Sequence, residues 1–104
     1  MGFLANRRIA AWTEGLKRWA VAESKRLGPD DPESDFCLGV IQAVMTAQRY
    51  GPPLSDAELT KLPLQHMQGY VCARGLINNV LQFGDAPTGD YRTLLEQPFS
   101  EPLR

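Results

Sequence analysis

The chain has 104 residues, of which 43% are hydrophobic and 22% charged, and its formal net charge is −1. This composition is typical of one globular domain and excludes global disorder, and the near-neutral charge argues against a dedicated nucleic-acid binder, which is usually basic. No run approaches the roughly 18 apolar residues of a membrane span, and the N-terminus lacks a signal-peptide pattern, so we expect a cytoplasmic protein.

Residues 4–27 are predicted to form a long amphipathic helix. Apolar residues such as Ile9, Trp12 and Leu16 recur near the helical period, and Gly28, followed by a proline, is a typical C-terminal signal. The helix contains most of the basic residues of the chain, which are our candidates for nucleic-acid binding. These are Arg7, Arg8, Lys17, Arg18, Lys25 and Arg26.

A second helix is expected to begin with Asp31 as its N-cap and Pro32 as its first residue, and to run to about Tyr50. It has no charged side chain between Phe36 and Gln48, which is too apolar for a helix with only one buried face. The polar or small positions recur every three or four residues and therefore share one line. We predict a helix buried on most of its circumference, with this narrow polar line facing solvent. The line consists of Asp35, Gly39, Gln42, Thr46 and Arg49.

Two further helices are expected after a proline-rich turn. Ser55 and Glu58 form a capping box that predicts the start of a short helix, and Pro63 interrupts it. A long helix then covers about residues 64–83, with Gly84 as its C-terminal glycine. The polar side chains of this long helix are almost all uncharged.

The C-terminal tail, residues 85–104, changes in composition. Residues 90–96 are predicted to form one or two helical turns, and residues 97–104, which contain two prolines, an extended segment. Phe99 and Leu103 give this segment two apolar anchors. The sequence leaves open whether they pack on their own chain or on a partner.

No pattern indicates a catalytic, cofactor or metal site. Cys37 and Cys72 lie in apolar stretches that raise a thiol pKa, and the single histidine, His66, provides no paired metal-ligand spacing. We therefore expect two buried free thiols and a non-enzymatic protein. An enzyme would need a polar pocket built from residues such as His66, Tyr70 and Arg74 with a loop acid.

The fold class expected for this single domain, residues 1–104, is all-α: a small bundle of about four helices with a partly extended tail. Because the second and fourth helices have so little charge, we expect an apolar helical surface to contact another copy or another protein. The predicted function is a small cytoplasmic regulator that binds and modulates or inhibits a protein partner, for example as an anti-activator of a transcription factor; the alternative is nucleic-acid binding through the first helix. The interface candidates are Val40, Val44, Met45, Gly69, Ala73, Ile77, Val80, Phe99 and Leu103.

Overall fold

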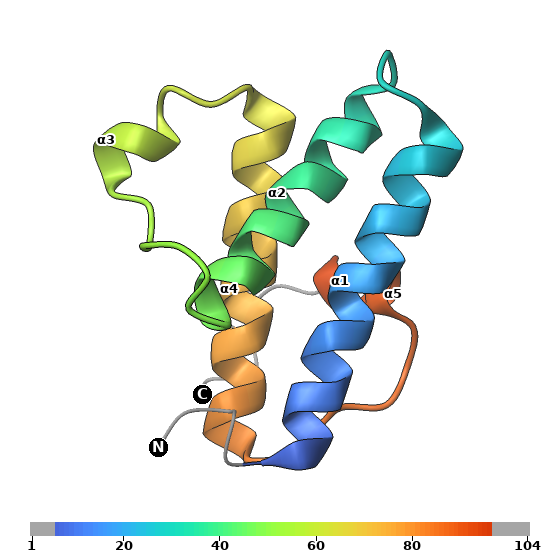
Figure 1. Cartoon of the computed structure of the whole chain (residues 1–104), viewed down its shortest axis with the longest axis vertical. Coiled ribbons are helices and arrows are strands. Elements are labelled where there is room, and N and C mark those ends of the chain that lie inside the picture. Colours follow the sequence, from blue (N-terminus) through green and yellow to red (C-terminus); the bar gives the residue numbers. More distant parts are fainter. Residues whose placement is uncertain (1–5, 97–104) are drawn as a thin grey trace.

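The computed structural model of the chain describes residues 6–96 (Figure 1). The predicted all-α bundle is confirmed, and no strand occurs within this range. Residues 1–5 and 97–104 lie outside the described residues, and so do Phe99 and Leu103. The helices are α1 (Arg7–Leu27), α2 (Pro32–Ala47), α3 (Asp56–Leu59), α4 (Leu64–Phe83) and α5 (Tyr91–Leu95).

Helix α2 lies between the two other long helices. Figure 1 shows α1 and α2 as an antiparallel hairpin, with α2 crossing in front of α4. The connection that contains α3 leads the chain back, so that α2 and α4 run in the same general direction. Helix α5 packs on the far side of the bundle in the view of Figure 1, and its residues Leu94 and Leu95 enter the core.

The helix starts follow from their capping residues. Asn6 caps α1 by accepting hydrogen bonds from the backbone N–H groups of Arg8 and Ile9 at 3.0 and 3.1 Å. Asn6, which the predicted range 4–27 placed inside the helix, is therefore its N-cap, and the described helix begins at Arg7. Asp31 caps α2 through Glu33, with a proline in the first turn, as predicted.

The predicted capping box at the start of α3 is present in both directions. The backbone N–H of Glu58 donates to the Ser55 hydroxyl at 3.2 Å, and the backbone N–H of Ser55 donates to the Glu58 carboxylate at 2.9 Å. Gly84 ends α4 in the left-handed conformation with φ 79°. Both ends confirm the corresponding sequence signals.

Helix α2 ends earlier than predicted, at Ala47 and not near Tyr50. The backbone N–H of Tyr50 donates to the carbonyl of Met45 at 2.9 Å, and that of Arg49 donates to the carbonyl of Thr46 at 3.0 Å. This pair of bonds is a Schellman motif, which requires a left-handed residue at its turn. Arg49 takes that position with φ 66°, although glycine is the usual residue there.

The prediction that the polar line of α2 faces solvent is wrong at Gly39, whereas Arg49 is exposed and Asp35, Gln42 and Thr46 are half-buried. Gly39 is buried, and a Cβ atom there would collide with the carbonyl oxygen of His66 in α4. Gly69 of α4 is buried in the same way against the carbonyl of Phe36. Because glycine has no side chain, Gly39 and Gly69 let the backbones of α2 and α4 approach each other closely. Gly39 therefore lies at the crossing of the two helices. The side of α2 that faces water is therefore mainly apolar.

The core is filled from all three long helices. Leu16 of α1, Val40 and Val44 of α2 and Tyr70 of α4 are fully buried. The Tyr70 hydroxyl accepts a hydrogen bond from the backbone N–H of Leu54 at 3.2 Å, which attaches the segment before α3 to α4. The buried polar group of this side chain is thereby satisfied.

Candidate functional site

Most of the predicted interface residues lie inside the core of the chain. Val40, Val44 and Ala73 have no exposed surface, and Ile77 and Val80 have 2% and 3%. Gly69 is buried at the helix crossing. These six residues are enclosed by the chain itself. The sequence did not separate them from interface residues, because the apolar residues at helix-helix contacts within a bundle resemble those at contacts between chains. Of the predicted set, Met45 alone among the described residues is exposed, with 40% of its surface accessible.

The residues that α2 does present to solvent form what we call the outer line of α2. Leu38 and Met45, seven residues apart, are 43% and 40% exposed. Ile41 and Gln42 lie between them on the same side and are half-buried. None of these four side chains is charged, although a water-facing helix side usually is.

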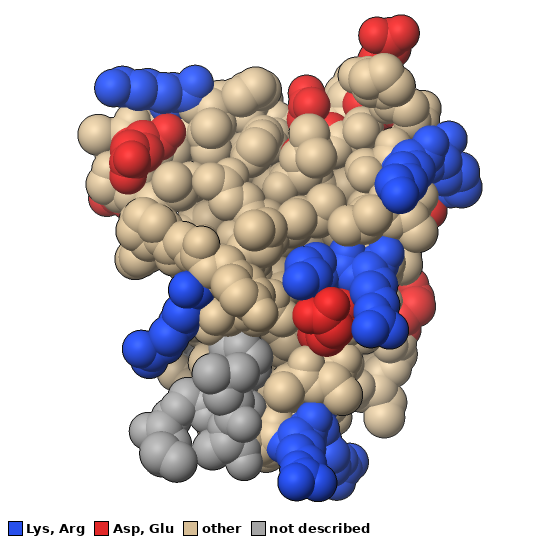
Figure 2. Space-filling model, viewed as in Figure 1, with Lys and Arg blue, Asp and Glu red and all other residues tan. Residues whose placement is uncertain are grey.

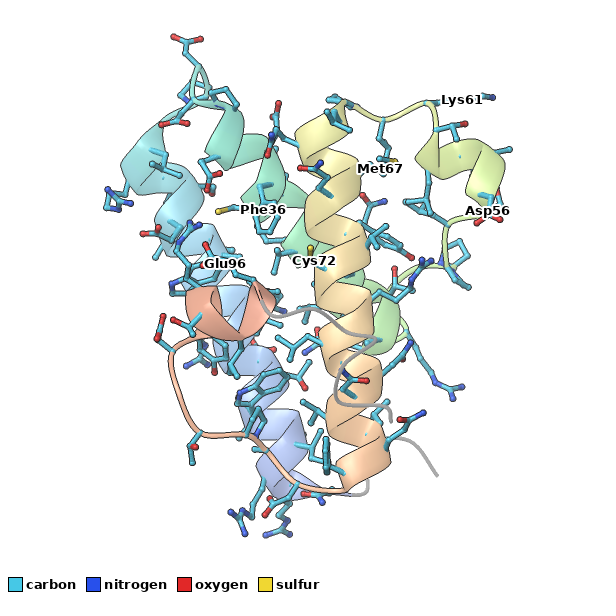
Figure 3. All side chains as sticks on the ribbon, turned by 180° about the vertical axis from the view of Figure 1, so that it is seen from behind. Phe36, Asp56, Lys61, Met67, Cys72 and Glu96 are labelled. Atoms are coloured by element: carbon cyan, nitrogen blue, oxygen red, sulfur yellow. The ribbon has the colours of Figure 1, made fainter. Side chains whose placement is uncertain are left out.

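Helix α4 has a second uncharged surface, which we call the outer line of α4. Leu64 and Val71 are 61% and 36% exposed and lie on one side with Gln68. Two further exposed amides, Asn78 and Gln82, continue the line toward the end of the helix. Figure 3 shows the molecule from the side on which α4 lies in front, with Met67 and Cys72 labelled.

The one charged side chain of α4, Arg74, flanks this line: it lies three residues after Val71 and four before Asn78, and it lines a pocket together with Asn78. The Arg74 guanidinium lies 5.5 Å from the centre of the Tyr70 ring. A pocket of about 210 Å³ beside it is lined by residues that include Tyr70, Arg74 and Pro53 but no carboxylate and no histidine. This pocket brings Tyr70 and Arg74 together, and His66 is not among its lining residues.

His66, Cys37 and Cys72 have surroundings that are typical of residues with a structural role. His66 and Gln42 form a hydrogen bond of 2.7 Å between α4 and α2. Cys37 is buried and Cys72 half-buried, both as free thiols, and burial raises the pKa of each. A raised thiol pKa disfavours the thiolate that nucleophilic catalysis and metal binding require. Within residues 6–96, no group of three or more His, Cys, Asp or Glu side chains is placed to hold a metal ion.

The six basic residues of α1 differ in how freely they face solvent. Arg8 pairs with Asp85 at 3.3 Å, and Arg26 pairs with Glu23 at 2.8 Å. Both Lys17 and Arg18 lie near Glu14, at 3.4 and 3.8 Å. The two others, Arg7 and Lys25, are exposed and make no ion pair with the residues of the described range.

A cluster of charged side chains around Arg92 of α5 has no counterpart among the residues predicted from the sequence. The Arg92 guanidinium pairs with Glu33 at 3.0 Å and with Glu23 at 3.5 Å, and lies 5.5 Å from the ring centre of Trp19. The cluster ties α5 to α1 and α2. Because its acids come from separate elements and no local motif joins them, it could not be found from spacing along the chain.

Two hollows flank α5. One of about 240 Å³ lies beside the Arg92 cluster and is mostly polar, with Gln65 and Gln68 in its wall. The other, of about 350 Å³, is mainly apolar and lies between the second half of α4 and the loop before α5. Its lining residues are Leu76, Asn79, Val80, Phe83, Asp85, Ala86, Pro87 and Leu94.

Comparison with known proteins gives no relative to guide the assignment: no protein-family model matches the chain, and no curated protein or solved structure matches it significantly. No helix in the described part of the chain is both long and apolar enough to cross a membrane. The functional assignment therefore rests on the surfaces of α1, α2 and α4.

Proposed function

We propose that this chain is a small non-enzymatic regulatory protein that binds a protein partner and modulates or inhibits it. The partner would be held by an apolar helical surface that covers its functional or dimerisation surface, as an anti-activator covers a transcription factor. We place this activity in the cytoplasm and expect the protein to associate with itself as well.

The observation that supports this proposal best is the outer line of α4. Leu64, Gln68 and Val71 are exposed without a charged side chain among them. An exposed, uncharged line with apolar members is typical of surfaces that are covered in a complex. Amide side chains along the line can exchange hydrogen bonds with water for hydrogen bonds with a partner, at lower desolvation cost than charged groups.

Nucleic-acid binding through α1 is the second candidate. Arg7, Arg18 and Lys25 are spaced by 11 and 7 residues, which places them on one outer side of the helix. The helix as a whole carries six cations against Glu14 and Glu23. Four of these cations, however, lie beside carboxylates, which weakens their attraction for phosphate.

Affinity capture from the lysate of the native host separates the two candidates. The tagged chain is incubated with nuclease at moderate salt, and retained proteins are identified by mass spectrometry. We expect one protein in stoichiometric amount, because contacts made by apolar and amide groups depend weakly on salt. Retention of nucleic acid without nuclease, lost steeply as salt increases, would instead favour the basic side of α1.

A further inference from the structure

The outer line of α2 lies on a different side of the molecule from that of α4. Figure 2 shows the side on which α2 lies in front, with a broad uncharged area across its middle. Leu38 and Met45 of α2 expose 43% and 40% of their surface. Ile41 and Gln42 complete the line, which runs along a helix of 16 residues, about 24 Å in length.

The two ends of this line have opposite charges. Asp35 lies one turn before Leu38, and the loop that precedes α2 adds Asp30 and Asp31. At the other end Arg49 is exposed; Lys17 of α1 also reaches this end, but its ammonium group pairs with Glu14 at 3.4 Å. The line therefore has Asp35 near one end and Arg49 near the other.

Asp35 and Arg49 have no ionic partner within the described residues. The ion pairs of this range involve other acids and other cations. Arg49 also retains the left-handed conformation that glycine would adopt more easily. A non-glycine residue at such a position points to a function of its side chain.

A second copy of the chain fits this surface when the two α2 helices run antiparallel. Leu38 and Met45 are centred between residues 41 and 42 of α2; Asp35 lies three residues before Leu38, and Arg49 lies in the turn that follows the end of the helix at Ala47. A two-fold axis between residues 41 and 42 would place Leu38 of each copy against Met45 of the other. The same axis would bring Asp35 of each copy to Arg49 of the other. A parallel arrangement would bring like charges together at both ends.

We propose that the chain forms a symmetric homodimer through the outer line of α2, with apolar contacts in the centre and an Asp35–Arg49 pair at each end. This inference specifies the self-association included in the proposed function, and it leaves the outer line of α4 free for a different protein. One helix per copy makes a small interface, so we expect a monomer–dimer equilibrium with a dissociation constant in the micromolar range.

Sedimentation equilibrium over a concentration series tests the dimer. We expect wild type to dimerise and Met45→Glu to weaken the dimer at least about a hundredfold, because a carboxylate would enter the apolar centre twice. Ala22→Glu adds the same charge at an exposed position on α1 outside the line and should leave the dimer unchanged. Both variants change exposed positions, and circular dichroism checks that they fold.

A charge exchange tests the antiparallel register. Arg49→Glu and Asp35→Lys should each weaken the dimer about tenfold, because each breaks two symmetric pairs and brings like charges together. The double variant should restore dimerisation, since both pairs form again with reversed sign. A loss of helix stability alone would not be rescued in this way.

A wild-type chain that stays monomeric at every concentration would overturn the inference, as would a dimer insensitive to Met45→Glu. Single-charge variants that weaken the dimer without rescue in the double variant would overturn the register. In all these cases, capture of a partner protein through α4 would still support the partner binding of the proposed function. Conversely, loss of partner capture with an intact dimer would refute only the proposed function.

Discussion

Replacing Gly39 with alanine tests the close approach of α2 and α4. In an isolated helix this change is stabilising by about 1 kcal/mol, because alanine has the higher helix propensity. In this chain the new Cβ atom would collide with the carbonyl oxygen of His66 and lie 2.6 Å from the backbone nitrogen of Tyr70. Both atoms belong to the backbone of α4, so no side-chain rotation can make room for it.

The magnitude follows from this geometry. Helix α4 has to move away from α2 by about 1 Å, which loosens the packing of neighbouring core side chains such as Val40 and Tyr70; overpacking of this kind destabilises by about 1–3 kcal/mol. We expect the free energy of unfolding to decrease by about 2 kcal/mol. The melting temperature should fall by roughly 8–16 °C, since 1 kcal/mol corresponds to about 4–8 °C in a domain of this size.

Thermal and urea unfolding followed by far-UV circular dichroism measures this change. In Gly69→Ala the new Cβ atom would collide with the carbonyl of Phe36, so the free energy of unfolding of this variant should decrease by a similar amount. The double variant should lose less than the sum, because helices that have already separated accommodate a second methyl group more easily. Ala22→Gly, at an exposed position on α1, controls for helix propensity alone. An increase in stability for Gly39→Ala would refute the close approach.

Three further predictions concern local features of the fold. Arg49→Gly should raise the free energy of unfolding of the dilute monomer by about 0.5–1 kcal/mol in urea titrations, because glycine tolerates the left-handed conformation. Stability should fall as the pH drops below about 4, in unfolding curves recorded at a series of pH values. The reason is that the backbone N–H of Ser55 and the hydroxyl of Thr93 hold the pKa values of the Glu58 and Asp90 carboxyls below normal. Such carboxyls stabilise the fold fully above their unfolded pKa, and this contribution is lost as the pH falls through the lower folded value. Alkylation at neutral pH, read by mass spectrometry, should modify the half-buried Cys72 slowly and the buried Cys37 only on unfolding.

The helix boundaries set by local chemistry were predictable from the sequence. The Asp31 cap, the Ser55–Glu58 box and the Gly84 terminus each depend on backbone bonds within a few residues, and all are present. The end of α2 was not predictable in this way. The residue at its turn is Arg49, whose side chain gives no signal for the left-handed conformation that it adopts.

The orientation of α2 about its own axis could not be predicted from the sequence, for a different reason. When almost every position of a helix is apolar, periodicity does not distinguish the side that faces α1 or α4 from the side that faces water. Gly39 was assigned to a polar line because it is not hydrophobic, although its lack of a side chain suits it to the crossing. Consequently the predicted interface set contained core residues such as Val40 and Val44, and it missed the exposed Leu38.

The measurement that tests the central claim most directly is affinity capture with charge variants of the outer line of α4. Val71→Glu adds a carboxylate in the middle of this line, and Ala22→Glu adds the same charge at an exposed position on α1. We predict that wild type and Ala22→Glu retain the same stoichiometric protein from the host lysate and that Val71→Glu, although folded, loses it. Equal retention by Val71→Glu would contradict the assignment of α4 as the partner-binding surface.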